Sequence, residues 1–218
     1  MMLAIYGTGG AGKESLQTAS YVQKARQQWQ KIVFIDDTKP AGEFKGCEML
    51  PYAEFREKYS SEEIKIHVAL GEVTSKKKVA EKVMKDGYSL ESLVNPHAVV
   101  GKNVVINPGV QIKMGAVIGD GTVLETGAWV QAYTTVGSNC QIGEFCQIGA
   151  KACVGDNCRI GGTTFVGMHA VISEEISVGE NVIVGMASWV NKDLESDVTC
   201  IGAPARVVGK DKNHRVFK

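Results

Sequence analysis

A glycine-rich loop near the N-terminus is the first feature with chemical potential. Residues 3–6 form a short apolar run that predicts a buried strand, residues 7–12 read GTGGAG, and a helical stretch starts at Lys13. This G-x-G-x-x-G pattern between a strand and a helix lets backbone N–H groups and the helix N-terminus approach a diphosphate. The loop predicts a phosphate-binding turn, and a tight turn without a ligand is the competing interpretation.

An acidic pair ends the next predicted strand. Residues 31–35 form a second apolar run, followed directly by Asp36 and Asp37, and a third run over residues 66–70 ends at Gly71 before a helix predicted over residues 74–86. The carboxyl ends of parallel strands share one edge, so we expect these residues to gather beside the glycine loop, where an acidic side chain can accept hydrogen bonds from ribose hydroxyls. Only about 93 residues precede the repeat described next, one mononucleotide-binding half, which fits a nucleotide diphosphate-sugar better than NAD.

A six-residue repeat organises the rest of the chain. The position after each repeated aliphatic residue is usually Gly, which we expect to turn a corner because Gly accepts dihedrals that other residues avoid. Mostly small residues stand two positions before the aliphatic residues and share the interior with them, since alternate positions of a strand face the same side. Three faces per coil give a prism with an 18-residue turn. The aliphatic positions are Val100, Ile106, Ile112, Ile118, Leu124, Val130, Val136, Ile142, Ile148, Val154, Ile160, Val166, Ile172, Val178, Val184 and Val190.

Four of the six cysteines fall within this repeat. Cys140, Cys146 and Cys158 fall in the small inward slot, where they act as small hydrophobic residues, and Cys153 is expected to face outward. No CxxC pair is present, and no metal site is expected. The start of the chain lacks the features of a secretion signal, so we expect reduced cysteines and a cytoplasmic protein.

Charge composition excludes some partners. Lys+Arg and Asp+Glu both count 24, so no net field favours nucleic acid or an anionic membrane, and membrane insertion is not expected. The basic run Lys76-Lys77-Lys78 continues into an apolar periodicity and predicts a solvated helix face. His67 lies within an apolar run and is expected to be a core histidine.

The order of these motifs resembles one bacterial family, the sialic acid O-acetyltransferases and UDP-4-amino-sugar N-acetyltransferases. The resemblance rests on YGTGGAGK at residues 6–13, FIDD at 34–37, VNPHA at 94–98, the hexapeptides, and IGAPAR at 201–206. It implies a Rossmann-like nucleotide-sugar-binding domain over residues 1–93 and a left-handed parallel β-helix acyltransferase domain with a C-terminal tail over residues 94–218. It also implies a homotrimer that binds acetyl-CoA in the groove between neighbouring helices. Exposed apolar residues such as Trp129 and Tyr133 would favour subunit contacts.

The resemblance assigns roles to residues of this chain. The nucleotide-sugar, expected to be UDP-linked, would contact Gly9, Gly10, Gly12, Lys13, Asp36, Asp37 and Gly71. Acetyl-CoA would contact Gln147, Gly149, Gly167, Gly185, Ala187 and Arg206. The catalytic candidates are Ser138, Asn139 and His169. The implied activity is transfer of an acetyl group from acetyl-CoA to the amino group of a nucleotide-linked sugar in surface-glycan biosynthesis.

One departure from the family pattern concerns the base. Members usually carry a His and an acidic residue where this chain has Ser138 and Asn139, and a second family His falls at Gln147. In one reading the amine attacks without a protein base, because positioning supplies about 7 kcal/mol or more. In another, His169 or next His97 serves as the base. In a third, the fold is an inactive trimeric binding scaffold.

Other functions remain weaker alternatives. Sugar O-acetylation makes the missing base more serious, because the hydroxyl proton must leave during attack. A zinc lyase needs three histidines at one metal, whereas the repeat region offers His97 and His169 alone. An NAD-linked oxidoreductase needs a second mononucleotide-binding half.

Overall fold

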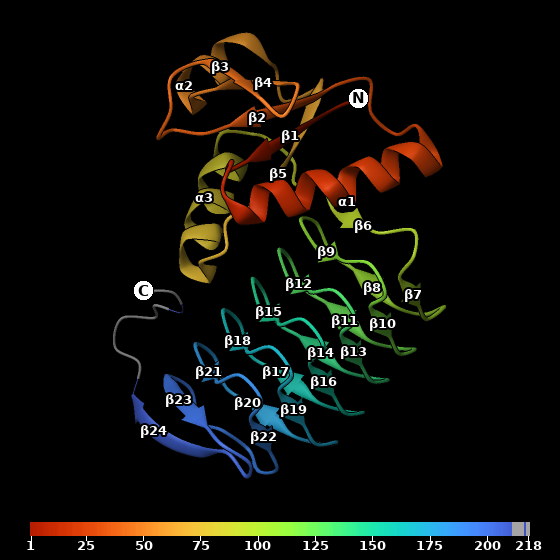
Figure 1. Cartoon of the computed structure of the whole chain (residues 1–218), viewed down its shortest axis with the longest axis vertical. Coiled ribbons are helices and arrows are strands. Elements are labelled where there is room, and N and C mark those ends of the chain that lie inside the picture. The colour runs from red at the N-terminus through yellow and green to blue at the C-terminus, as the bar shows by residue number, and fades with distance from the viewer. Residues whose placement is uncertain (211–215, 217–218) are drawn as a thin grey trace.

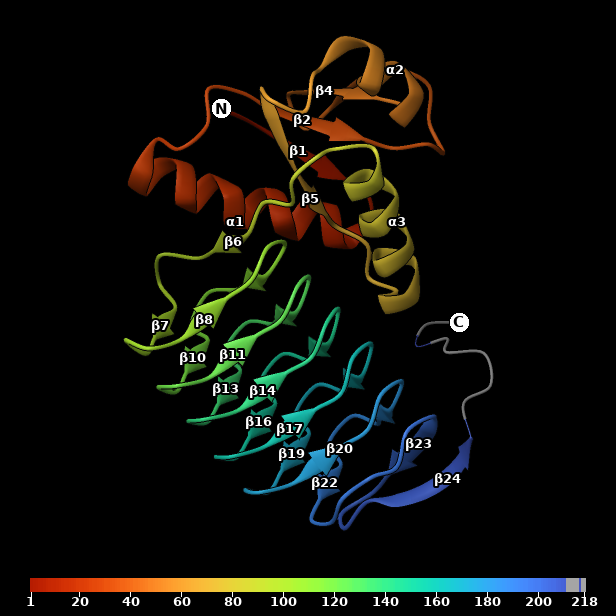
Figure 2. The ribbon, with the colours of Figure 1, turned by 180° about the vertical axis from the view of Figure 1, so that it is seen from behind.

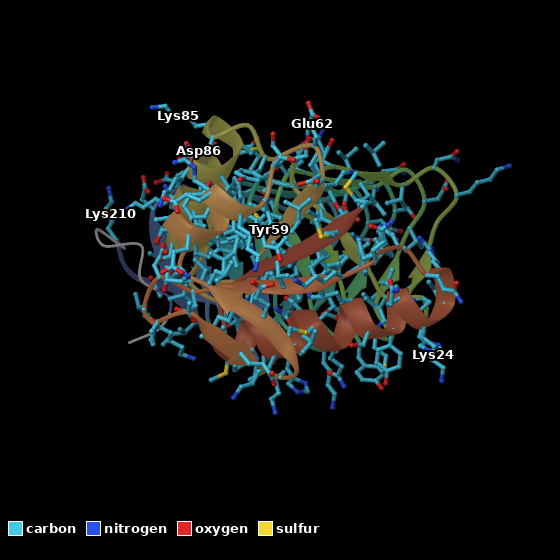
Figure 3. The ribbon with its side chains drawn as sticks, turned by 90° about the horizontal axis from the view of Figure 1, so that it is seen from above. Lys24, Tyr59, Glu62, Lys85, Asp86 and Lys210 are labelled. Carbon is cyan, nitrogen blue, oxygen red and sulfur yellow. The ribbon has the colours of Figure 1, made fainter. Side chains whose placement is uncertain are left out.

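An α/β domain rests against one side of a long parallel β-helix (Figures 1 and 2). The computed structural model describes residues 1–210 and residue 216. Among these residues, no helix is long and apolar enough to cross a membrane. Viewed from above, Lys24, Glu62 and Lys85 extend outward from the N-terminal domain (Figure 3).

The N-terminal domain is built on a five-stranded sheet of order β3-β4-β2-β1-β5. Its predicted strands are β1 (Met2–Tyr6), β2 (Ile32–Ile35) and β5 (Ile64–Val68), and the predicted helices are α1 (Gly10–Arg26) and α3 (Val73–Lys85). The sequence did not indicate β3 (Gly42–Phe44), β4 (Cys47–Leu50) or α2 (Tyr52–Lys58). The strands are parallel except for β3, which pairs antiparallel with β4.

The β-helix has three faces of two-residue strands, and each strand from Leu93–Val94 to Val171–Ile172 pairs with the strand 18 residues further along, as predicted. We name each face by its first strand. The β7 face holds β7 (Val99–Val100), β10 (Val117–Ile118), β13 (Thr135–Val136), β16 (Cys153–Val154), β19 (Val171–Ile172) and β22 (Trp189–Val190). The β8 face holds β8 (Val105–Ile106), β11 (Val123–Leu124), β14 (Gln141–Ile142), β17 (Arg159–Ile160) and β20 (Ser177–Val178). The β6 face holds β6 (Leu93–Val94), β9 (Gln111–Ile112), β12 (Trp129–Val130), β15 (Gln147–Ile148), β18 (Phe165–Val166) and β21 (Ile183–Val184), and continues into β23 (Val198–Ile201) and β24 (Arg206–Lys210).

The corners differ from the sequence prediction. From Ile106 to Val184, left-handed dihedrals occur three residues after each aliphatic residue, for example at Asn139 (φ 55°) and His169 (φ 58°), and not at the glycine that directly follows many of these aliphatic residues. Those glycines are required by space instead. A Cβ on Gly149 would lie 2.6 Å from Val166 O and 2.7 Å from Met168 N, so a side chain there would collide with the next coil.

The small inward slots carry hydroxyl and thiol groups that donate to backbone carbonyl oxygens. Thr134 Oγ1 donates to the carbonyl oxygen of Gly149, and Cys146 Sγ donates in the same way to Gly161. The pattern repeats at Thr122, Cys140, Cys158 and Thr164. The three cysteines predicted to lie inside are fully buried, and Cys153 is exposed, as predicted.

The N-terminal domain covers the β6 face, and this contact corrects two predictions. Trp129 is only 1% exposed, because His67 stacks on its ring at 5.7 Å between centroids. Lys76 is also 1% exposed, so the lysine run of α3 is not wholly solvated. The predicted apolar exterior nevertheless includes Tyr133, which is 59% exposed.

Candidate functional site

A cavity of about 590 Å³ lies between the glycine loop and the β6 face. We call it the main cavity. Gly10, Ala11, Glu14 and Gly71 line it from the N-terminal domain, and residue Val216 also contributes. Its remaining wall is the β-helix, formed by Trp129, Gln131, Gln147, Gly149, Ala150, Phe165, Met168, Ile183, Val184, Gly185 and Met186.

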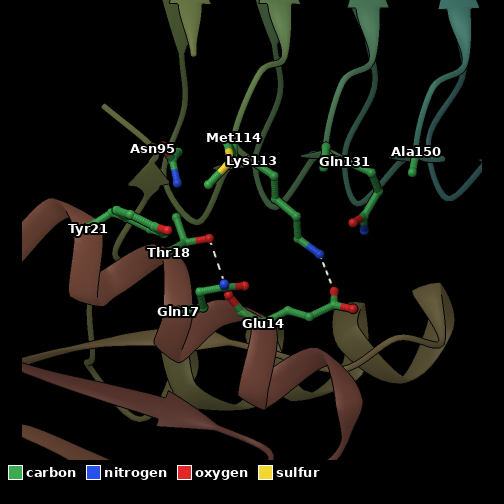
Figure 4. Close-up of a pocket in the computed structure, with 10 residues that line it drawn as sticks. Glu14, Gln17, Thr18, Tyr21, Asn95, Lys113, Met114, Gln131 and Ala150 are labelled. Atoms are coloured by element: carbon green, nitrogen blue, oxygen red, sulfur yellow. Dashed lines mark hydrogen bonds and ion pairs between the residues drawn. The ribbon is translucent and has the colours of Figure 1, made fainter. Parts of the chain in front are cut away.

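A second cavity of about 290 Å³, the side cavity, adjoins the first (Figure 4). It lies between α1 and the first coils and is lined by Glu14, Gln17, Thr18, Tyr21, Asn95, Lys113, Met114, Gln131, Ala132 and Ala150. Glu14, Gln131 and Ala150 line both cavities. The two hollows therefore form one groove along the covered side of the β-helix.

The main cavity brings together residues that the sequence assigned to two different ligands. Gly10 and Gly71, predicted to contact the nucleotide-sugar, lie opposite Gln147, Gly149 and Gly185, predicted to contact acetyl-CoA. The lining does not include the predicted residues Gly9, Gly12, Lys13, Asp36, Asp37, Gly167, Ala187 and Arg206.

Asp36 ties the glycine loop to the end of β2. Its Oδ2 accepts hydrogen bonds from the N–H and hydroxyl of Thr8, and its Oδ1 accepts those of Thr38. Burial acts to raise the pKa of Asp36, but these four hydrogen bonds outweigh it and hold the pKa below its usual value. Both oxygens of the predicted ribose acceptor are thus already engaged. Lys39 completes the group by donating to Thr8 Oγ1 over 2.7 Å.

Asp37 is engaged in a similar way. Its Oδ2 accepts the hydroxyl of Tyr6, and its Oδ1 accepts the backbone N–H of Tyr52 over 2.7 Å. Burial, together with the Asp37 carboxylate, raises the pKa of Tyr6. The Asp37 side chain therefore holds the start of α2 against the sheet.

Ser138 and Asn139 lie on the edge between the β7 and β8 faces, away from the β6 face that forms the main cavity. The Ser138 N–H donates to Asp156 Oδ1 over 2.7 Å. Asn139 occupies the left-handed corner position, where its short polar side chain is well tolerated.

His169 lies on a different edge, between the β6 and β7 faces, and is exposed. Its neighbour Met168 lines the main cavity. His97 occupies the equivalent turn 72 residues earlier, four 18-residue coils away (169 − 97 = 72), which corresponds to about 19 Å at the spacing of paired strands. The two histidines therefore cannot act on the same atom within one chain.

An ion pair between Glu14 and Lys113 was missed by sequence reasoning. The two side chains meet at the junction of the cavities (Figure 4). Burial lowers the pKa of Lys113, whereas the hydrogen bond and charge of Glu14 oppose the change. Glu14 follows Gly10 by about one helical turn, and this spacing could have indicated that its side chain lies near the glycine loop.

Gln147 and Trp129 bring buried polar atoms to the wall of the main cavity. Gln147 Oε1 and Trp129 Nε1 have no hydrogen-bond partner among the described residues. Within the same residues, no group of three or more His, Cys, Asp or Glu side chains could hold a metal ion.

Comparisons with known proteins agree with this arrangement. Residues 2–83 match the family model of the PglD N-terminal domain, and residues 89–199, just over half of the chain, match that of the GMPPB C-terminal domain. The acetyltransferase domain of PglB from Neisseria gonorrhoeae superposes with a TM-score of 0.89 at 28% identity, covering 95% of this chain and 99% of that one. The chain belongs to the hexapeptide-repeat sugar acyltransferase family.

Two further structures extend the comparison. PerB from Caulobacter crescentus, solved with CoA and GDP-perosamine, gives a TM-score of 0.83 at 25% identity, covering 96% of this chain and 98% of that one. WeeI from Acinetobacter baumannii shares the fold, with a TM-score of 0.80 at 23% identity and coverage of 95% and 100%. A comparison with curated proteins gives no significant match. The predicted fold, an α/β domain followed by a left-handed parallel β-helix, is confirmed for this sugar acyltransferase.

Proposed function

We propose that this sugar acyltransferase moves an acetyl group from acetyl-CoA to the amino group of a nucleotide-linked amino sugar. The main cavity carries the proposal, because the glycine loop forms one wall and the candidate acyl-CoA residues of the β-helix form the other. The PglB domain is also known in complex with acetyl coenzyme A, and PerB in complex with CoA and GDP-perosamine.

The diphosphate binds at the glycine loop in this proposal. The Gly10 N–H stands at the first residue of α1, where the helix dipole favours negative charge. A Cβ built on Gly9 or Gly10 meets no atom within 4 Å, so open space surrounds the loop for phosphates. The acyl-CoA runs along the β6 face past Gln147, Gly149 and Gly185.

We further propose a homotrimer. The β7 face presents exposed large apolar side chains on its first two and last two strands, namely Val99, Val117, Val171 and Trp189. Ser138 and Asn139 lie on an edge that does not border the main cavity of their own chain, so a second copy would be needed to bring them to it.

The six free thiols are consistent with a reducing compartment such as the cytoplasm.

An amine acceptor fits the residues at hand. Attack by a neutral amine relies on positioning, which Ser138, Asn139 and Gln147 can supply through hydrogen bonds. His169, beside the cavity-lining Met168, is the alternative base.

Release of CoA thiol tests the function directly. Purified protein is incubated with acetyl-CoA and a panel of UDP- and GDP-linked amino sugars, and free thiol and acetylated product are measured. Turnover with an amino sugar, absent without it, supports the transferase. Binding of both ligands without thiol release would favour the inactive scaffold.

A further inference from the structure

The carboxylate of Glu14 lies where the main and side cavities meet (Figure 4). Among the described residues that line the two cavities, Glu14 is the only acidic one. Its charge is therefore not part of a general acidic surface. Apart from Lys113, its ion-pair partner, the other lining side chains are amides, hydroxyls and apolar groups, so Glu14 is the single negative group that faces the groove.

A buried lysine holds this carboxylate in place. The Lys113 side chain is 9% exposed and pairs with Glu14 Oε2, whereas the Glu14 side chain is 58% exposed. The Lys113 ammonium also lies 5.7 Å from the centroid of the buried Trp129 ring, which restricts its position. Glu14 Oε1 makes no hydrogen bond to the described part of the chain. One oxygen is anchored, and the other remains available to a ligand.

The spacing from the glycine loop suits a sugar. Glu14 follows Gly10 by four residues in α1, an advance of about 6 Å along the helix axis. A pyranose ring attached to a diphosphate at the loop spans a similar length. A substituent on the far side of the ring would therefore come within reach of Glu14.

We propose that Glu14 binds the amino group of the acceptor sugar and thereby selects an amine over a hydroxyl. This inference rests on the proposed function, since it assigns a substrate contact within the same cavity. A carboxylate forms charge-assisted hydrogen bonds with an ammonium, and these are stronger than its bonds to a neutral hydroxyl. When the amine is neutral, an N–H still donates to Glu14, and the nitrogen lone pair stays free for the thioester.

Binding measurements separate this contact from turnover. GDP-perosamine and its analogue with a hydroxyl in place of the amine are titrated calorimetrically, with the matching UDP-linked pair alongside. The wild-type protein should bind the amino sugar at least about tenfold more tightly than the hydroxyl analogue, which corresponds to one charge-assisted contact. Glu14→Gln should bind both alike, and its affinity for the free nucleoside diphosphate should change by less than about threefold.

Control variants address charge and folding. Glu81→Gln removes the same charge from an exposed position of α3 and should keep the preference. Because Glu14→Gln leaves Lys113 without its partner, the change is repeated in a Lys113→Met background, where no unpaired ammonium remains. Within that background, addition of Glu14→Gln must still remove any remaining preference for the amine.

The outcomes are distinct from those of the transferase assay. A Glu14→Gln protein that still prefers the amino sugar overturns the inference. So does a wild-type protein that binds the two members of each pair equally or binds neither pair. A wild-type protein that prefers the amino sugar but releases no CoA thiol would defeat the proposed transferase and leave amine recognition by Glu14 standing.

Discussion

The Lys76 ammonium lies 4.5 Å from the centroid of the Trp129 ring, and this contact joins the two domains. Lys76 Nζ has no hydrogen-bond partner among the described residues. Burial is the main cause that lowers the pKa of Lys76 from 10.5 to about 7. Cys146 acts to raise this pKa, and the charge of Lys113 acts to lower it further. The face of the Trp129 ring favours the charged form of Lys76, but the loss of solvation outweighs this contact and favours the neutral amine.

This buried lysine predicts a stability that rises with pH. Between about 7 and 10.5 the unfolded chain binds a proton at Lys76 that the folded chain does not, so the free energy of unfolding increases by up to about 1.4 kcal/mol per pH unit. Denaturant unfolding should therefore show a gain on the order of 2 kcal/mol between about pH 7.5 and pH 9.5 that is absent in Lys76→Met. Lys78→Met, at an exposed position of α3, should retain the wild-type slope. Equal slopes in the wild type and Lys76→Met would show that Lys76 stays charged when folded.

Gly10→Val should abolish nucleotide-sugar binding without unfolding the protein. The new side chain meets open space at its Cβ, so the fold tolerates it, yet it occupies the volume that a diphosphate needs. Calorimetry with UDP and GDP measures the loss. Gly42→Val, also in open space but outside the cavities, is the matched control and should bind normally. Unchanged affinity in Gly10→Val would mean that the loop is only a turn.

Gly12→Ala should behave differently from Gly10→Val. A Cβ on Gly12 would lie 2.0 Å from Gly7 O, so even one methyl group forces the loop and α1 apart. We expect a loss of stability of about 1–3 kcal/mol, as for other overpacked sites. The melting temperatures of both variants test this difference. A Gly12→Ala protein with the melting temperature of the wild type would contradict it.

The trimer is tested by light scattering at micromolar concentration. Val171→Glu places a charge among the exposed apolar side chains of the β7 face and should shift the mass toward the monomer. Gln141→Glu introduces the same charge at an exposed position of the β8 face and should leave the mass unchanged. A monomeric wild type would contradict the proposed trimer and, with it, an acetyl-CoA site formed between subunits.

Replacement of the candidate bases should have modest effects. If the amine needs no protein base, His169→Ala, His97→Ala and Ser138→Ala should each lower kcat/KM by less than about tenfold. A true general base contributes about a hundredfold or more. A loss of that size confined to His169→Ala, with the KM for acetyl-CoA preserved, would make His169 the base and refute the base-free reading.

The six-residue periodicity by itself determined the β-helix. Because a repeated aliphatic residue can be buried only if successive coils are in register, the pattern fixed the 18-residue coil, the stacking of Val136 on Val154 and the inward position of Cys140. The strand, glycine loop and helix at residues 2–26 were also predictable, since each has a local signal.

The tertiary structure alone decided which face the N-terminal domain covers. Trp129 and Tyr133 both follow the repeat as outward residues, yet one is 1% exposed and the other 59%. Repeat patterns specify inside and outside for a coil, but carry no information about a second domain packing on the exterior. For the same reason the sequence did not reveal that Lys76 is buried, that Asp36 is fully hydrogen-bonded, or that Glu14 meets Lys113 across 99 residues of sequence.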